Sequence, residues 1–195
     1  MLPVTPFNPH CRRYHGALSL LRVDLERMPS LRPAFKKDGT VTAANASKIN
    51  DGAASLVLTT AEHAEQIGAR PLARLVAQAS VAQEPEWFTT APVKAAQEVL
   101  DRAGLQSGEI DLWEVNEAFA AVAMAFLKEL DLPQDRVNVR GGAVALGHPI
   151  GASGARILVT LLHAMAERKV RRGCAAICIG GGEATAMILE REVEA

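Results

Sequence analysis

The sequence is short of cysteine and has no excess of charge of either sign. Its 195 residues include three cysteines, and 21 basic residues stand against 22 acidic ones, which gives a formal net charge of -1. Three cysteines cannot form a disulfide framework, so a reducing compartment such as the cytoplasm is favoured. Balanced charge gives no electrostatic reason to bind nucleic acid or an anionic membrane. We therefore expect a cytoplasmic protein whose partners are small molecules or proteins.

The sequence also lacks long apolar runs and the spacings of metal ligands. Charge or glycine interrupts each apolar stretch well before the roughly 18 residues that a membrane-spanning helix needs. Cys174 and Cys178 would lie about 13 Å apart on an extended strand, which exceeds the ~7 Å between Cα atoms that a disulfide allows. No CxxC pair and no paired His and Cys spacing occurs, so no metal site is predicted.

Regular α/β patterning fills most of the chain. A helix is predicted over 61–67, ending at Gly68, where we place a boundary between two domains, residues 1–68 and 69–195. Strand and helix patterns then alternate and end in two strands, which predicts a layered α/β domain with a mixed five-stranded sheet. The five strands are predicted over 72–82, 111–115, 136–139, 174–179 and 184–190, the helices over 92–103, 117–130 and 151–168, and a separate strand over 53–59.

Two of these helices are apolar almost all round. Residues 117–130 and 151–168 carry apolar side chains on more than one face. In a protein with this composition, such helices are expected to be buried on both sides. One sheet face cannot cover them, so the chain should pair with itself or aggregate, because exposed apolar patches of that size seek partners. We therefore expect a homo-oligomer.

A histidine between two glycine clusters stands at the centre of the stretch 138–156. Pro149 fixes its own φ and keeps His148 out of the α region, so the imidazole is predicted to sit on rigid backbone at a helix entrance. The glycines match neither the lysine-containing phosphate loop nor the dinucleotide fingerprint. A structural histidine beside a glycine-rich turn is the alternative interpretation.

Two further side chains belong with His148. Cys178 opens the motif CIGGGEATA after an apolar run, and Asn116 precedes the helix predicted over 117–130, where it could simply be the N-cap. His148 and Cys178 are both predicted to follow strands, and segments leaving the carboxyl ends of strands converge at one edge of an α/β sheet. An amide, an imidazole and a thiol that share a cleft suit acyl transfer, in which protons move and an oxyanion is held.

Three motifs resemble the C-terminal signatures of the thiolases, in the correct order. They are NEAFA at 116–120, GGAVALGHPIGASGAR at 141–156 and CIGGGEATA at 178–186, and the resemblance covers roughly residues 31–190. It implies a layered fold of two βαβαβαββ halves, normally dimeric or tetrameric, of which this chain is the second half with a remnant of the first. It also implies an exchange between acetyl-CoA plus acyl-CoA and 3-ketoacyl-CoA plus CoA, with coenzyme A thioesters as substrates and no cofactor.

The resemblance assigns roles to four residues. It implies that His148 activates the nucleophilic cysteine and helps to stabilise the thioester oxyanion. It implies that Cys178 is the second cysteine, which takes a proton from the α-carbon of acetyl-CoA or returns one to the leaving group. Asn116 would orient a water in that oxyanion hole, and the backbone N–H of Gly180 would serve the other hole.

The resemblance also implies a substrate-binding group. Ser47 matches the serine that contacts the pantetheine of coenzyme A, and Phe88, Ala118 and Phe119 fall where thiolases line the acyl pocket. The polar residues around Ser47 alone would fit simple turn chemistry. Ala44 and Lys48 replace usual glycines, so this loop is expected to be less tight.

The sequence departs from the family in one respect. No segment carries the motif of the nucleophilic cysteine, and Cys11 lies in proline-rich, basic surroundings unlike it. Residues 1–30 also lose the family pattern. Two hypotheses follow: an acyltransferase part that is competent when a first half is supplied, or a non-catalytic half that binds coenzyme A or serves in assembly.

Overall fold

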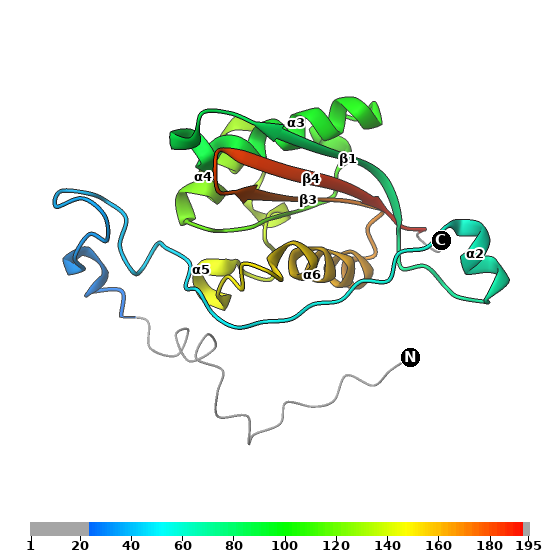
Figure 1. Ribbon diagram of the computed structural model, residues 1–195, viewed down its shortest axis with the longest axis horizontal. Helices are drawn as coiled ribbons and strands as arrows, with labels where there is room; N and C mark the ends of the chain where they lie inside the picture. The colour runs from blue at the N-terminus through cyan, green and yellow to red at the C-terminus, as the bar shows by residue number, and fades with distance from the viewer. Residues whose placement is uncertain (1–23, 193–195) are drawn as a thin grey trace, which may run out of the picture.

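The computed structural model describes residues 24–192, and these are organised around a four-stranded mixed sheet (Figure 1). The strand order is β1-β4-β3-β2. Strands β1 and β3 both pair antiparallel with β4, whereas β2 pairs parallel with β3. The bounds are Arg74–Ala82 for β1, Leu112–Val115 for β2, Arg172–Ile179 for β3 and Glu183–Glu190 for β4. The predicted α/β class is confirmed, but the prediction of five strands was wrong.

Helices cover both faces of the sheet. Helices α3 and α4 lie on one face and α6 lies on the other, which gives three layers (Figure 1). Their bounds are Ala91–Ala103, Ala120–Glu129 and Ser153–Arg168, and the shorter helices are α2, Ala61–Gln66, and α5, Ala143–Leu146. Short 3-10 segments are η1, Met28–Ser30; η2, Pro85–Thr90; η3, Ser107–Glu109; and η4, Gln134–Arg136.

Helix α3 shows why the local sequence folds as it does. Val93, Val99 and Leu100 are spaced to share one face and are buried against the sheet. Pro92 occupies the first turn, where its missing N–H removes no helical hydrogen bond. Gly104 ends the helix with φ at 66°, a left-handed conformation that glycine adopts without steric cost. The prediction of a helix closed by this glycine is confirmed.

The predicted strand over 136–139 is replaced by a side-chain contact. Val137 makes only an isolated parallel bridge to Trp113. Asn138 has φ at 48°, so the chain cannot continue extended. Its side chain instead pairs with Val115 as a peptide group would: Oδ1 accepts from the Val115 N–H at 2.8 Å, and Nδ2 donates to the Val115 carbonyl at 2.9 Å. One amide side chain thus caps the edge of the sheet.

The predicted strand over 53–59 is also wrong. This segment has no regular structure, and Val57 and Leu58 are 94% and 77% exposed. Within residues 24–192 no strand pairs with it, and an extended segment without a partner leaves its ladder hydrogen bonds unmade. The segment has the sequence pattern of a strand, but no neighbouring strand is placed to pair with it.

The two strongly apolar helices are covered on one side only. Helix α4 starts three residues later than predicted, at Ala120, and buries Val122 and Phe126 while Met124 is 68% exposed. Helix α6 buries Ile157 and Leu161, among others, against β2, β3 and β4. The expected burial on both sides is not found within this chain, and the homo-oligomer stays a prediction.

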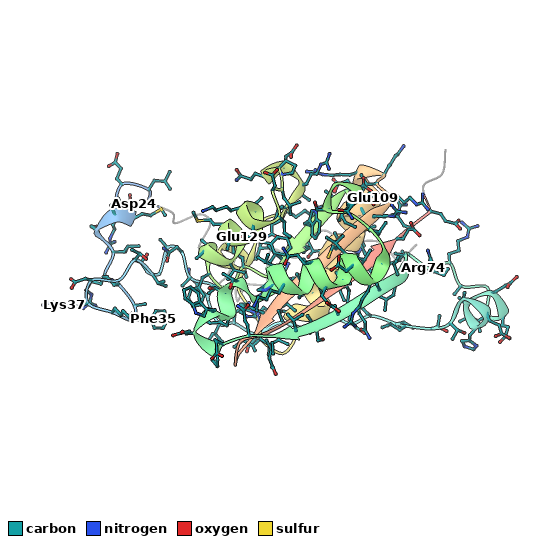
Figure 2. The ribbon with its side chains drawn as sticks, turned by 90° about the horizontal axis from the view of Figure 1, so that it is seen from above. Asp24, Phe35, Lys37, Arg74, Glu109 and Glu129 are labelled. Carbon is teal, nitrogen blue, oxygen red and sulfur yellow. The ribbon has the colours of Figure 1, made fainter. Side chains whose placement is uncertain are left out.

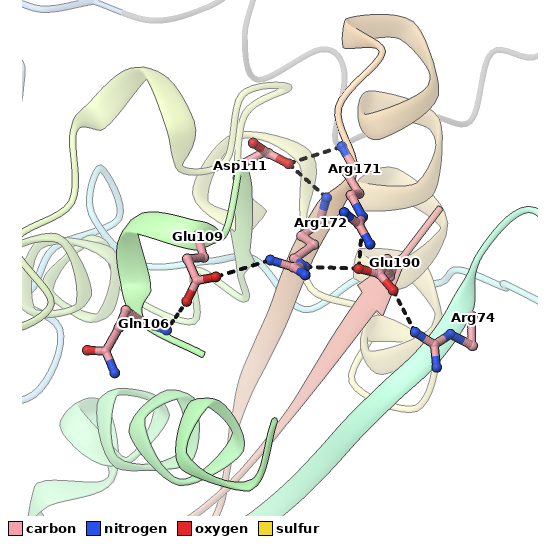
Figure 3. A network of polar contacts seen from close by, with 7 residues as sticks. All are labelled: Arg74, Gln106, Glu109, Asp111, Arg171, Arg172 and Glu190. Atoms are coloured by element: carbon pink, nitrogen blue, oxygen red, sulfur yellow. Dashed lines mark hydrogen bonds and ion pairs between the residues drawn. The ribbon is translucent and has the colours of Figure 1, made fainter. Parts of the chain in front are cut away.

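An arginine-rich network closes the end of the sheet where β2 and β3 begin (Figure 3). The Glu190 carboxylate accepts hydrogen bonds from Arg74 at 2.6 Å and from Arg172 at 3.0 Å, and it also pairs with Arg171. These contacts, with Arg74 first, lower the pKa of Glu190. The Asp111 carboxylate accepts from two backbone N–H groups of the same corner. The network joins all four strands at the end remote from the predicted catalytic residues.

Residues 24–73, called the arm below, are much less buried than residues 74–192, called the sheet domain. Figure 2 shows Asp24, Phe35 and Lys37 to one side of the packed layers, and Figure 1 shows the arm running past α5 and α6 to α2. In the arm, Ala64 is the one buried residue among those described. The arm is therefore held mainly by polar contacts.

Candidate active site

His148 is held by its backbone in the loop between α5 and α6. Its N–H donates to the Lys48 carbonyl of the arm at 2.7 Å. Gly147, immediately before it, has φ at 97°, a conformation that side-chain-bearing residues rarely adopt. The Pro149 carbonyl accepts the backbone N–H of Ser153 at 2.8 Å, which closes the loop onto α6. The predicted position at a helix entrance is confirmed, but the expectation that His148 follows a strand was wrong, because α5 precedes it.

Both ring nitrogens of His148 have partners. Nδ1 lies 2.6 Å from the Oγ of Ser153, and Nε2 lies 3.3 Å from the Nδ2 of Asn116. Burial, and then the positive charge of Arg156, lower the pKa of His148. A neutral imidazole is thereby favoured at physiological pH, and a neutral imidazole can accept a proton.

Asn116 is fully buried at the end of β2. Its backbone N–H donates to the Ala176 carbonyl of β3 at 2.9 Å, and its side chain points to His148. The N-cap alternative is wrong, because α4 begins only at Ala120 and Phe119 holds the N-cap position. Within the described residues the Oδ1 of Asn116 is buried and has no hydrogen-bond partner, so one acceptor at the site is unsatisfied.

Cys178 and Gly180 lie at the same edge of the sheet. Cys178 is two residues beyond Ala176 on β3, next to the end of β2 where Asn116 lies. Its free thiol is half-buried, and burial is the main cause that raises its pKa. Gly180 follows in the exposed turn between β3 and β4. The structure thus brings His148 and Asn116 into contact and places the thiol on the adjacent strand.

The residues predicted to bind the substrate also contact one another. The Ser47 N–H donates to the Ala118 carbonyl at 3.0 Å. The Phe119 ring packs edge-on against Phe88 and against Phe35, with centroids 6.1 Å apart in both pairs. Sequence reasoning missed Phe35, although an aromatic residue in the charged segment FKKDG was a usable signal. The roles of Ser47, Phe88, Ala118 and Phe119 in binding stay predictions.

The arm runs between the two loops that carry the site. Its residues 45–47 bond the backbone of 118–120, and its Lys48 bonds His148. The polar cluster does make turn contacts, since Asn45 accepts from the Thr42 N–H at 2.8 Å. Beside this junction lies an open cavity of about 470 Å³ between residues 50–54 and 149–155. Its lining includes none of the predicted site residues.

A buried ion pair joins two of the elements that carry the site. Glu114 is 2% exposed on β2, and its Oε1 accepts from Arg156 of α6 at 3.1 Å. Burial raises the pKa of Glu114 to about 7, against the opposing effect of Arg156. The pair ties β2, which ends one residue before Asn116, to the helix that begins at Ser153. The signal in the sequence was an acid within an apolar strand and an arginine within an apolar helix.

Comparison with known protein families identifies both parts of the chain. Residues 69–191 match the family model described as "Thiolase, C-terminal domain", and residues 20–62 match "Thiolase, N-terminal domain". The chain belongs to the thiolase family. The resemblance of the three motifs is thereby confirmed.

Individual thiolases agree with this assignment. An acetyl-CoA acetyltransferase of Escherichia coli (strain K12) is 56% identical over 166 residues, which cover 85% of this chain and 42% of that protein. A crystal structure of the Bacillus anthracis acetyl-CoA acetyltransferase superposes with a TM-score of 0.82 at 45% identity, covering 85% of this chain and 42% of that one. Human mitochondrial 3-ketoacyl-CoA thiolase in complex with CoA superposes with a TM-score of 0.80 at 37% identity, covering 88% and 43%. This thiolase chain therefore spans less than half the length of the relatives that it matches.

Within the described residues no helix is long and apolar enough to cross a membrane, and no group of three or more His, Cys, Asp or Glu side chains is arranged to hold a metal ion. The thiolase-like half fold is shown by the superpositions.

Proposed function

We propose that the chain supplies the base and the second thiol of a cytoplasmic thiolase-type acyltransferase. The reaction is the reversible exchange between acetyl-CoA plus acyl-CoA and 3-ketoacyl-CoA plus CoA. The observation that carries this proposal is the contact of a buried amide, Asn116, with the Nε2 of His148, beside the strand that bears Cys178. The names of the relatives support it, because they are acetyl-CoA acetyltransferases and 3-ketoacyl-CoA thiolases.

His148 would act in the first half of the reaction. Its Nε2 takes the proton from a nucleophilic thiol, and the resulting thiolate attacks the thioester carbonyl of the acyl substrate. The new C–S bond forms, the C–S bond to CoA breaks, and the imidazolium returns its proton to the CoA sulfur. The ring nitrogen, together with a water held by the Oδ1 of Asn116, would stabilise the oxyanion between these events.

Cys178 would act in the second half. As a thiolate it removes an α-proton from acetyl-CoA, and the enolate carbon attacks the acyl-enzyme carbonyl while the enzyme thiolate leaves. The backbone N–H of Gly180 would stabilise the enolate oxygen. Burial raises the pKa of Cys178, so the protonated thiol is favoured at rest and the thiolate, once formed, is a stronger base than an exposed one. This suits a group that must remove a weakly acidic proton from carbon.

The substrates would be held at the junction of arm and sheet domain. Ser47 would contact the pantetheine of the CoA thioester, and Phe88, Ala118 and Phe119 would line the acyl pocket. The packing of Phe88 on Phe119 supports this assignment, as does the hydrogen bond that joins Ser47 to Ala118. Coenzyme A thioesters are then substrates, and the reaction steps use no separate cofactor or metal ion.

Neither cysteine among the described residues suits the role of nucleophile, and Cys11 lies outside the described residues. Cys174 is buried, and its burial raises the pKa far above its usual value, so it cannot be acylated readily. Cys178 already serves as the second thiol. A non-catalytic half that binds coenzyme A is the alternative, and the retained contact between His148 and Asn116 favours the enzyme.

Assembly with another polypeptide is part of the proposal. Met124 of α4 and Ile150 next to α6 are 68% and 64% exposed, which supports a homo-oligomer or a pairing with a first half. Sedimentation at micromolar concentration checks this. A compact monomer that binds no hydrophobic dye would contradict it.

Reconstitution tests the function. The purified chain is mixed with a thiolase first-half polypeptide that carries the nucleophilic cysteine, and thiolysis of acetoacetyl-CoA is followed. We expect no thiolysis by either part alone and activity from the mixture. Burst release by this chain alone that survives Cys11→Ala would show that it has its own nucleophile. No activity in a mixture that forms a stable complex would favour the non-catalytic alternative.

A further inference from the structure

The imidazole of His148 is bounded by two side chains with different hydrogen-bonding capacities. Asn116 presents its Nδ2 to Nε2 at 3.3 Å, and an amide nitrogen can only donate. With the amide in this orientation, Nε2 offers its lone pair. In a neutral imidazole one nitrogen carries the proton, so that proton is on Nδ1.

The Nδ1 of His148 contacts the side-chain hydroxyl of Ser153. Its Oγ lies 2.6 Å from Nδ1 and also 3.1 Å from the Pro149 carbonyl, to which it donates. A hydroxyl has one hydrogen to donate, and a carbonyl oxygen can only accept, so a hydroxyl that donates to Pro149 accepts from Nδ1–H. Ser153 is 0% exposed, which leaves no water to exchange for either partner. Both ends of the ring thus favour the same tautomer.

We propose that Ser153 is a positioning residue that holds neutral His148 in its Nδ1–H tautomer and keeps the Nε2 lone pair directed toward Asn116. The tautomer is inferred from these contacts, whereas the use of Nε2 as a base rests on the proposed function. An imidazole in water prefers the proton on Nε2, where it would occupy the position that a base needs free. Ser153 can impose the opposite choice because it is fixed at the start of α6 by its own N–H bond to Pro149.

The tautomer can be read in the full chain without any catalytic assay. The chain is labelled with ¹⁵N-histidine, and the ring nitrogens are correlated with the ring protons by NMR above the imidazole pKa. His148 is assigned by the loss of its signals in His148→Gln. We expect a pyrrole-type shift for Nδ1 and a pyridine-type shift for Nε2. In Ser153→Ala we expect the two shifts to move toward each other or to exchange.

Two comparison variants separate the hydroxyl from general damage. Thr160→Val removes another hydroxyl from the same helix. That hydroxyl contacts Arg156 and does not contact His148, so its loss should leave the His148 chemical shifts unchanged. Ser153→Thr keeps a hydroxyl and should retain the wild-type pattern. Circular dichroism shows whether each variant is folded.

A pyridine-type Nδ1 in the wild-type chain would overturn the proposal, whatever happens to the variants. Retention of the wild-type shifts in a folded Ser153→Ala chain would overturn it too. Neither outcome depends on thiolysis, so failure of this inference and failure of the proposed function can be told apart.

Discussion

The arm and the sheet domain contribute to the same site by different means. The sheet domain holds its residues through burial: both apolar clusters lie within it, and Asn116 and Ser153 are 0% exposed. The arm buries almost nothing, yet its backbone bonds the segment 118–120 and His148. The proposed catalytic side chains therefore lie in the well-buried part, and the arm bonds the backbone around them.

The difference has an energetic consequence. Each buried large apolar side chain is worth roughly 1.5–3 kcal/mol, whereas a typical hydrogen bond contributes about 0.5–1.5 kcal/mol net. A segment held by a few hydrogen bonds opens locally at lower cost than a core strand. The two regions should thus respond differently to the same kind of substitution.

The largest difference is expected in catalysis by the reconstituted enzyme. His148→Ala should reduce acylation by about 10²–10⁴-fold, because the thiol loses its base. Cys178→Ala should spare acylation and instead suppress the exchange of acetyl-CoA α-protons with solvent. Ser47→Ala, in the arm, should raise KM more than it lowers kcat. Burst kinetics and deuterium exchange measure the two partial reactions, and equal losses in both for either His148 or Cys178 would refute this division of labour.

Core truncation should separate the two regions by stability. Phe126 is 1% exposed and packs edge-on against Trp113 with ring centroids 5.5 Å apart. Phe126→Ala should cost about 3–5 kcal/mol of unfolding free energy, since it leaves a cavity. Phe35→Ala removes the same ring from the arm, where it is 74% exposed, and should cost less than about 1 kcal/mol. Urea unfolding compares them, and similar costs would mean that the arm is part of the core.

The sequence predicted the sheet domain far better than the arm. Helix α3 and strand β1 follow from periodicity and a glycine stop, because those signals are local. The strand over 53–59 was wrong since strand pattern alone does not supply a neighbouring strand. The strand over 136–139 was wrong because the Asn138 side chain replaces a peptide group, which no periodicity reveals.

The candidate site divides in the same manner. Motifs identified Asn116, His148 and Cys178, since the residue types alone indicate the chemistry of these side chains. The bond from His148 to Lys48 is made by backbone atoms, so residue identity says little about it. Ser153 and the pair of Glu114 with Arg156 act through contacts between elements far apart in sequence, and only the fold shows them.

The burial of Glu114 should make the stability of the sheet domain depend on pH, because desolvation raises its pKa against the opposing effect of Arg156. The pKa of Glu114 rises from 4.5 to about 7, so the folded state binds this proton more tightly than the unfolded chain. Its contribution is fully present below about pH 4.5 and is lost as the pH rises through about 7, a change of up to about 3 kcal/mol. Glu114→Gln should flatten this dependence in urea titrations.

Glu109→Gln is the matched control for that measurement. Glu109 also pairs with an arginine, Arg172, but its side chain is 47% exposed, so its desolvation is small. A pH dependence that Glu109→Gln removes and Glu114→Gln keeps would assign the effect to the other end of the sheet.

The smallest effect is expected from loosening the arm itself. Asn45 holds its turn by accepting from the Thr42 N–H at 2.8 Å and donating to the Thr40 carbonyl at 2.9 Å, and the next residues bond the site loops. Asn45→Ala should accelerate amide exchange at His148 and Ala120 by up to about 30-fold, since it removes two hydrogen bonds worth about 1 kcal/mol each. The urea midpoint should not move, because the core is untouched. Gln66→Ala, a substitution on α2 far along the arm, should change neither quantity. Unchanged exchange at His148 in Asn45→Ala would show that the sheet domain alone holds this loop.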